Sequence, residues 1–78
     1  MHSVYIIHSL SLDRYYSGMT TNLRKRVKQH RSGRTRSVPA SEDWIVVWSV
    51  TVDSSEAARA LEKRIKSRGA KRFLEDQE

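Results

Sequence analysis

The chain has 78 residues, no cysteine, and 15 Lys and Arg residues against 9 Asp and Glu, which gives a formal net charge of +6 at pH 7. This length suits one small domain and excludes two separate hydrophobic cores, because short chains bury a smaller fraction of their surface. The lack of cysteine excludes a disulfide framework and a thiolate metal site. No apolar run is long enough for a secretory signal or a membrane span, so we expect a soluble, cytoplasmic protein that does not contact membranes.

A β-hairpin is expected at the start of the chain. Residues 3–8 are rich in β-branched and aromatic side chains, and residues 14–19 form a second such run after a short connection. Gly18 lies within the second strand, where the missing side chain lets another group approach closely.

The first helix is predicted from about Leu23 until Gly33 ends it. Side-chain oxygens that can cap its start belong to three consecutive residues, Thr20, Thr21 and Asn22.

Helical spacing places a charged and a titratable residue beside the core of this helix. Leu23 and Val27 define the buried stripe, while Arg26 and His30, four residues apart, project together from one side of it. We therefore expect Arg26 and His30 to lie near the sheet and not on the far solvent face.

A polar segment and the most hydrophobic strand come next. Residues 33–43 contain the only proline, Pro39, and are expected to form a mobile basic loop. Residues 44–52 are predicted to be the third strand, with Trp44 and Trp48 on one face of it as core residues.

The second helix begins after Asp53, which resembles a capping box together with Glu56, and it ends at Gly69. Its apolar residues recur at helical spacing: Ala57, Ala58, Leu61 and Ile65. A short turn or helix follows before a frayed acidic tail over residues 76–78.

Glu62 lies at the margin of the apolar stripe of this second helix, three residues before Ile65 and four after Ala58. Its carboxylate can face the body of the domain. It can also form a helical ion pair with Lys66, worth about 0.3–0.5 kcal/mol.

The order of elements predicts an α+β fold, in which a three-stranded antiparallel sheet is flanked by two main helices and a short C-terminal helix. We expect a single domain over residues 1–75.

Basic residues are concentrated in two groups, which attract phosphate backbones without reading bases. The first lies in residues 24–36, which contain no acidic residue, and consists of Arg24, Lys25, Arg26, Lys28, Arg31, Arg34 and Arg36. The second consists of Lys63, Arg64, Lys66, Arg68, Lys71 and Arg72. The same charges also suit ordinary solvated helix faces, so charge alone leaves nucleic-acid binding open.

Several segments in order carry a family resemblance. VYII at residues 4–7 and YSG at residues 16–18 resemble the two halves of the GIY-YIG motif. The longer run YSGMTTNLRKRVKQHRSG resembles the family run that places Leu, Arg and His after the second half. DWIVVW resembles the strand before the second helix, and EAARALEKRIKSRGAKRFL resembles the helix with the metal-binding glutamate. The chain thus resembles small single-domain members of the GIY-YIG nuclease superfamily over nearly its whole length.

This resemblance implies a metal-dependent endonuclease that hydrolyses phosphodiester bonds, with DNA as the favoured substrate. Glu62 would bind a single divalent cation, Mg²⁺ or Mn²⁺, and Arg26 would hold a phosphate oxygen. Tyr5 and Tyr16 would orient and deprotonate the attacking water, with Tyr5 favoured as the base. His30 is a second candidate for proton transfer, because imidazole titrates near physiological pH.

Nucleic-acid contacts are predicted for the other basic residues around this site: Arg24, Lys25, Lys28, Arg31, Arg34, Arg36 and Lys66. Two alternatives stay open, namely a basic binding module with the same fold and no useful turnover, and a small interaction protein. A partner protein that supplies specificity is also possible, and the sequence leaves the oligomeric state open.

Overall fold

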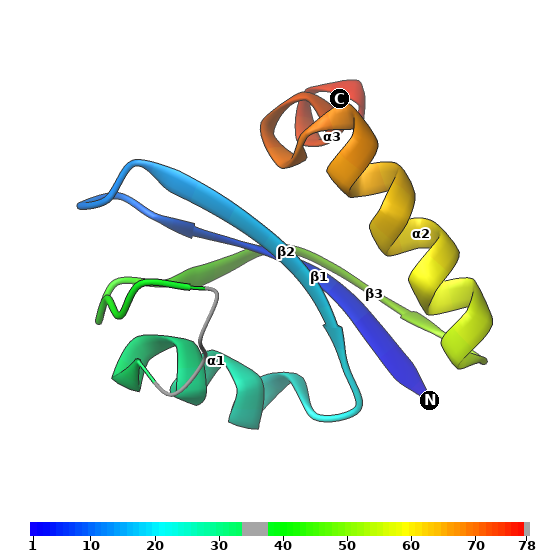
Figure 1. Ribbon diagram of the computed structural model, residues 1–78, viewed down its shortest axis with the longest axis horizontal. Helices are drawn as coiled ribbons and strands as arrows, with labels where there is room; N and C mark the ends of the chain where they lie inside the picture. Colours follow the sequence, from blue (N-terminus) through cyan, green and yellow to red (C-terminus); the bar gives the residue numbers. More distant parts are fainter. Residues whose placement is uncertain (34–37, 78) are drawn as a thin grey trace.

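The structure is a computed structural model that describes residues 1–33 and 38–77. Its elements lie close to their predicted bounds: β1 (His2–Ser9), β2 (Arg14–Thr20), α1 (Leu23–Ser32), β3 (Ile45–Val52), α2 (Ser55–Arg68) and α3 (Ala70–Asp76) (Figure 1). The predicted α+β fold is confirmed. No helix in these two ranges is long and apolar enough to cross a bilayer.

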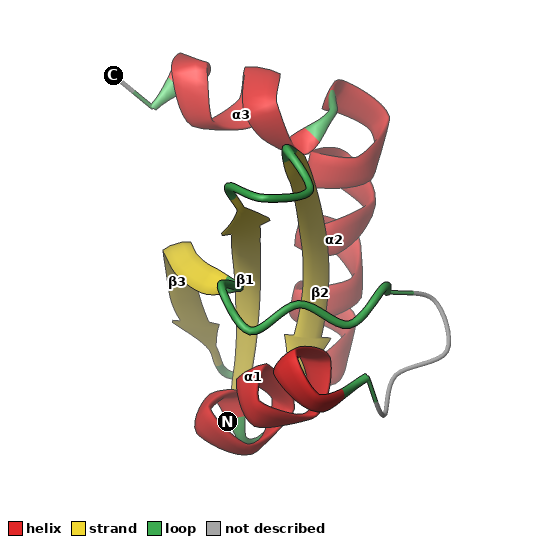
Figure 2. Ribbon diagram, turned by 90° about the vertical axis from the view of Figure 1, so that its left-hand side faces the viewer, coloured by secondary structure: helices red, strands yellow, loops and turns green. Residues whose placement is uncertain are grey.

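The three strands form one antiparallel sheet in the order β2-β1-β3, so β1 is central (Figure 2). Helix α1 covers one face of the sheet, and α2 and α3 cover the other (Figure 1). This arrangement explains the continuous apolar run of β1, because both of its faces are buried.

Alternate residues of β1 belong to two hydrophobic clusters. Val4 and Ile6 face α2 and α3, where they join Ala58, Ile65 and Phe73. Tyr5 and Ile7 face α1, where they join Val27, Val38 and Trp44.

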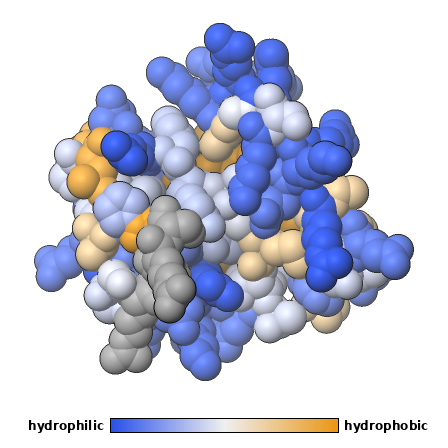
Figure 3. All heavy atoms as spheres, viewed as in Figure 1, coloured by the Kyte–Doolittle hydropathy of each residue, from blue (hydrophilic) through white to orange (hydrophobic). Residues whose placement is uncertain are grey.

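Figure 3 shows hydrophilic residues over most of one face of the molecule, with apolar residues in small separate groups.

A β-bulge interrupts the pairing of β1 with β3. Ile6 is opposite Trp48, but the next residue, Ile7, is opposite Val46, so Val47 is an extra residue in β3. A one-residue shift reverses the face on which the following side chains lie.

The bulge separates the two tryptophans. Trp44 is buried in the cluster beneath α1, whereas Trp48 packs on the other side of the sheet, with its ring 5.1 Å from that of Phe73. The prediction that Trp44 and Trp48 share one face is therefore wrong, although both contribute to the core.

The first turn of α1 is capped by Asn22, whose Oδ1 accepts a hydrogen bond from the Lys25 N–H at 3.1 Å. The helix ends at Gly33, as predicted, and this glycine has the left-handed φ of 79°.

The start of α2 differs from its prediction. Ser54, and not Asp53, is the N-cap, and its Oγ accepts a hydrogen bond from the Ala57 N–H at 3.1 Å. Glu56 consequently lies one position too early for a capping box.

The segment before β3 is partly outside the described residues, which omit 34–37. From Val38 onward it packs against the sheet: Val38 is buried, and the Trp44 indole N–H donates to the Pro39 carbonyl at 2.9 Å. The Asp43 carboxylate accepts hydrogen bonds from Ser9, Ser41 and the Ser11 backbone N–H. The second half of the predicted basic loop is thus tied to the β1–β2 hairpin.

Helix α3 extends through Asp76, the first residue of the predicted acidic tail. The Asp76 carboxylate accepts two hydrogen bonds from the Arg68 guanidinium, at 2.8 and 3.0 Å. This pair joins the last turns of α2 and α3.

Candidate active site

A tyrosine–histidine pair connects the central strand to α1. Tyr5 is only 2% exposed, and its Oη lies 2.8 Å from His30 Nε2, a hydrogen-bond distance. Alternation along β1 directs Tyr5 toward α1, and the helical stripe directs His30 back toward the sheet. The prediction that His30 lies near the sheet is confirmed, since its side chain is buried.

Gly18 makes room for this pair. It lies opposite Tyr5 in the β1–β2 register, and a Cβ at this position would be 2.6 Å from Tyr5 Oη and 2.8 Å from Tyr5 Cζ. It would also be 3.2 Å from Cε2 of Tyr16. The close approach expected at Gly18 is therefore made by tyrosine side chains.

Tyr16 completes an aromatic group around the histidine. Its ring lies edge-on to the His30 ring, with the centroids 5.2 Å apart, while the Tyr5 ring is 5.9 Å from the same histidine. Tyr16 is half-buried and comes from the edge strand β2. His30 thus contacts both tyrosines that the sequence predicted for the site.

The charges predicted for the site act on Tyr5. Burial raises the pKa of the Tyr5 phenol well above its ordinary value of about 10. Tyr16 raises this pKa further, the positive charge of Arg26 lowers it, and the negative charge of Glu62 raises it. Arg26 on α1 and Glu62 on α2 are therefore both close enough to influence one phenol on β1.

The surroundings of His30 favour its neutral form. Burial lowers its pKa from the ordinary histidine value, and the positive charge of Arg26 lowers it further. A neutral imidazole has one ring nitrogen without a proton, so His30 Nε2 can accept a hydrogen bond from Tyr5 in the matching tautomer.

Glu62 and Lys66 form an ion pair on α2, with Lys66 Nζ 3.0 Å from Glu62 Oε1. The hydrogen bond to Glu62 raises the pKa of Lys66, against a smaller opposing effect of burial. The negative charge of Glu62 and the presence of Tyr16 raise it as well. The ion pair predicted from helical spacing is present, and it lies beside the aromatic group.

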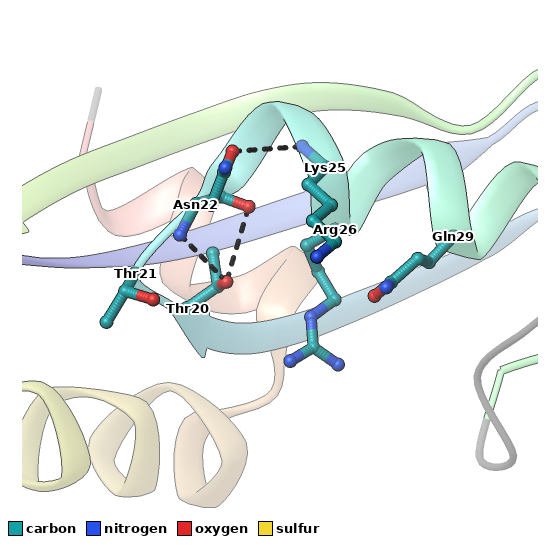
Figure 4. Close-up of a pocket in the computed structure, with 6 residues that line it drawn as sticks. All are labelled: Thr20, Thr21, Asn22, Lys25, Arg26 and Gln29. Carbon is teal, nitrogen blue, oxygen red and sulfur yellow. Dashed lines mark hydrogen bonds between the residues drawn. The ribbon is translucent and has the colours of Figure 1, made fainter.

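The site forms at the edge of the sheet marked by β2. Since α1 and α2 cover opposite faces, their side chains can come together only by reaching around this edge. Figure 4 shows Arg26 extending from α1 past β2, on the side where α2 lies. Of the five predicted catalytic residues, the structure brings Tyr5, Tyr16 and His30 into contact, and the charges of Arg26 and Glu62 act on the pKa of Tyr5.

A polar pocket of ≈ 340 Å³ adjoins this constellation at the start of α1 (Figure 4). It is lined by Thr20, Thr21, Asn22, Lys25, Arg26 and Gln29. Gln29 was not among the residues predicted for the site. Its position three residues after Arg26, on the same flank of the helix, was the available signal.

The predicted nucleic-acid-binding residues are divided by the structure. Lys25 lines the pocket with Arg26, and Lys66 pairs with Glu62. A separate hollow of ≈ 550 Å³, here called the α1–β3 hollow, lies on the other flank of α1 and is lined by Leu23, Arg24, Val27, Lys28, Arg31 and Val46. Arg34 and Arg36 lie outside the described residues.

Glu62 suits a hard divalent cation, although only as one ligand among several. Within residues 1–33 and 38–77, no group of three His, Asp or Glu side chains could enclose a metal ion. Mg²⁺ usually keeps several waters and binds through one or two carboxylates together with substrate phosphates. A single carboxylate such as that of Glu62 is compatible with that mode.

Known proteins resemble this chain along nearly its whole length. The profile of the GIY-YIG catalytic domain matches residues 1–74. A UPF0213 protein from Aeromonas salmonicida (strain A449) is 32% identical over 74 residues, which cover 94% of this chain and 53% of that protein. The chain thus spans about half the length of this relative. The solution NMR structure of a UPF0213 protein from Bacillus halodurans aligns with a TM-score of 0.59 and 28% identity, covering 99% of this chain and 84% of that one.

Proposed function

Because this chain belongs to the GIY-YIG catalytic-domain family, we propose that it is a metal-dependent endonuclease that hydrolyses phosphodiester bonds of nucleic acid, with DNA as the favoured substrate. The observation that carries the proposal is the grouping of Tyr5, Tyr16 and His30 between the sheet and α1, beside the polar pocket that Arg26 lines. The charges of Arg26 and Glu62 both act on the pKa of this buried Tyr5. Binding nucleic acid alone would need the cations but not the Glu62 carboxylate, whose ion pair with Lys66 contributes only about 0.3–0.5 kcal/mol.

Arg26 is proposed to bind a non-bridging oxygen of the scissile phosphate. Its planar group of fixed donors stabilises negative charge that grows in the transition state. Glu62 would hold one Mg²⁺ or Mn²⁺ ion, which polarises the phosphate when bound. Lys66, the ion-pair partner of Glu62, would contact a neighbouring phosphate.

Tyr5 and His30 are proposed to move the proton of the attacking water. Because burial raises the pKa of Tyr5, its phenol stays protonated at neutral pH and provides no free phenolate to act as a base. Tyr5 can instead receive a proton from water on Oη while passing its own proton to His30 Nε2, which lies 2.8 Å away. Tyr16 would orient the water from the β2 side.

The test is a cleavage assay with Mg²⁺ or Mn²⁺ on plasmid, branched and single-stranded substrates. We expect Glu62→Gln to abolish cleavage while salt-sensitive binding is retained, because binding depends on the cations. Glu56→Gln is the matched control, since it removes an exposed carboxylate from the first turn of the same helix. It should cleave like the wild type.

Arg26→Lys provides a second measurement. It keeps the charge but loses the planar donors, and the loss of one such stabilising group costs about 10²–10³ in turnover. No cleavage of any substrate by the wild-type protein, or equal cleavage by Glu62→Gln, would favour the alternative function of a basic binding module.

A further inference from the structure

Strand β3 has a free edge. It pairs with β1 on one side, and no strand of the described residues lies beyond it (Figure 2). Such an edge presents backbone N–H and C=O groups that can pair with another chain. Proteins usually protect an edge with charged side chains or proline, yet the β3 sequence IVVWSVTV contains neither. The bulge at Val47 is the one protective feature of this strand.

Apolar side chains are exposed along this strand, namely Ile45, Val46, Val47 and Val50. Ile45 is 52% exposed. Val50 lies opposite Val4, on the side of the sheet that carries α2, but α2 lies mainly across β1 and β2. Val46 lies opposite Ile7, on the side that carries α1.

The α1–β3 hollow adds positive charge on the α1 side of the same edge. Its apolar lining residues are Leu23, Val27 and Val46, and its other lining residues are Arg24, Lys28 and Arg31. Within the described part of the chain, no acidic residue lines it and none of these three cations belongs to an ion pair. Arg31 is held in place by a hydrogen bond from its Nε to the Trp44 carbonyl, at 2.9 Å.

We propose that the β3 edge and the α1–β3 hollow form one docking surface for an extended acidic segment of a partner protein. The segment pairs with β3 as an added strand, a recurrent way of binding peptides. Because side chains alternate across a strand, its acidic residues face Arg24, Lys28 and Arg31, and its apolar residues extend the surface of Ile45 and Val50.

Charge decides between this partner and other occupants. A second copy paired through β3 would bring another chain of net charge +6, with its own basic hollow, against the same edge. Nucleic acid would satisfy the cations but would leave Ile45 and Val50 uncovered. An acidic, partly apolar polypeptide complements both halves of the surface.

The proposal can be tested with the full chain and a short blocked peptide in which Glu and Val alternate. Chemical-shift changes in the ¹⁵N-labelled protein should be concentrated in β3 and at Arg24, Lys28 and Arg31. A peptide of the same composition with all Glu residues first should bind much more weakly. As an added strand it cannot place all of its Glu residues on the α1 side and all of its Val residues on the other side. A Lys–Val alternating peptide should not bind.

Two pairs of substitutions separate the surface from general electrostatic attraction. Arg24→Glu with Lys28→Glu should weaken peptide binding on the order of tenfold or more. Lys63→Glu with Arg64→Glu, an equal change of charge at exposed positions of α2, should leave the affinity unchanged. Val50→Lys should weaken binding from the apolar side, and circular dichroism should confirm that each variant is folded.

Any one of several results would overturn the proposal. These are equal binding of the block peptide, equal weakening by the α2 pair, displacement of the peptide from β3 by a duplex oligonucleotide, and a dimer in sedimentation that Val50→Lys dissociates. The last result would identify a second copy as the occupant. Absence of any shift change in β3 with the alternating peptide would also contradict it.

Discussion

At the scale of single residues, the contact between Gly18 and Tyr5 is the most sharply constrained feature of the site. Any side chain at position 18 meets a buried phenol that is already fixed by its hydrogen bond to His30. The same added Cβ would lie 3.2 Å from Cε2 of Tyr16. The tyrosines and the glycine therefore form one packing unit across β1 and β2.

We expect Gly18→Ala to lower the free energy of unfolding by about 1–3 kcal/mol, the usual penalty for overpacking a core. Urea denaturation measures this loss. In a Tyr5→Phe background the same substitution should cost less, because the Oη atom at 2.6 Å is gone. Equal losses in the two backgrounds would show that the contact with Oη is unimportant.

The stability of the protein should depend on pH through His30. Its folded-state pKa is lowered by burial and by Arg26, so the unfolded chain binds a proton more readily. The stability that the folded state gains by keeping His30 neutral is fully present above pH 6.5, which is about the pKa of an unfolded histidine. It is lost as the pH falls below that pKa. The free energy of unfolding should therefore decrease as the pH falls from about 6.5 through the lower folded-state pKa of His30.

In His30→Gln the free energy of unfolding should depend less on pH below about 6.5, since glutamine does not titrate. Chemical denaturation at a series of pH values provides the comparison. A variant with the wild-type slope would mean that other groups cause the decrease.

At the scale of elements, the start of α1 agrees with its prediction, with Asn22 as the cap, whereas the cap of α2 is Ser54 and not Asp53. Several oxygen-bearing residues precede both helices, and any of them can serve as a cap in isolation. The backbone direction at the end of β2 selects Asn22, and that at the end of β3 selects Ser54.

The cap assignments predict different stabilities. Asn22→Ala and Ser54→Ala should each lower the free energy of unfolding by about 1 kcal/mol, because a first-turn N–H loses its acceptor. Asp53→Ala should cost only a few tenths, about the value of an exposed charge near a helix start. Thermal or urea unfolding of the three variants distinguishes them, and a larger loss for Asp53→Ala would contradict the assignment.

Strand order is another property of elements that composition did not reveal. The central strand β1 and the edge strand β3 are both apolar runs. The pairing places β1 between its two neighbours and leaves β3 with exposed Ile45 and Val50. The bulge then separates Trp44 from Trp48, because one extra residue changes the face of the sheet.

At the scale of the whole molecule, the basic residues of α1 are distributed over two flanks with different neighbours. Lys25 belongs to the flank of Arg26, whereas Arg24 and Lys28 line the α1–β3 hollow. A nucleic acid that lies across the proposed site should therefore contact the first flank and the Lys66 side of α2.

Salt dependence of oligonucleotide binding tests this arrangement. Lys25→Gln and Lys66→Gln should each reduce the slope of log K against log salt by about 1, the value for one lost phosphate contact. Arg24→Gln should leave the slope nearly unchanged. Equal reductions in all three variants would mean that the nucleic acid covers both flanks.

The sequence by itself determined the elements, the fold class and the candidate residues. Hydrophobic periodicity, glycines at the ends of helices and the order of the motif segments are local properties. They can be read from the sequence without knowing how the chain folds. The place of Arg26 and His30 beside the apolar stripe of α1 is of this kind, because helical spacing alone specifies it.

Only the tertiary structure decided which of these residues act on one another. Arg26 and Glu62 are on helices that cover opposite faces, and their influence on Tyr5 depends on how both helices reach the β2 edge. The different neighbours of the two flanks of α1 have the same origin, because Thr20 and Val46 belong to different strands. Contacts between residues far apart in sequence follow from strand pairing and helix placement, which no local pattern encodes.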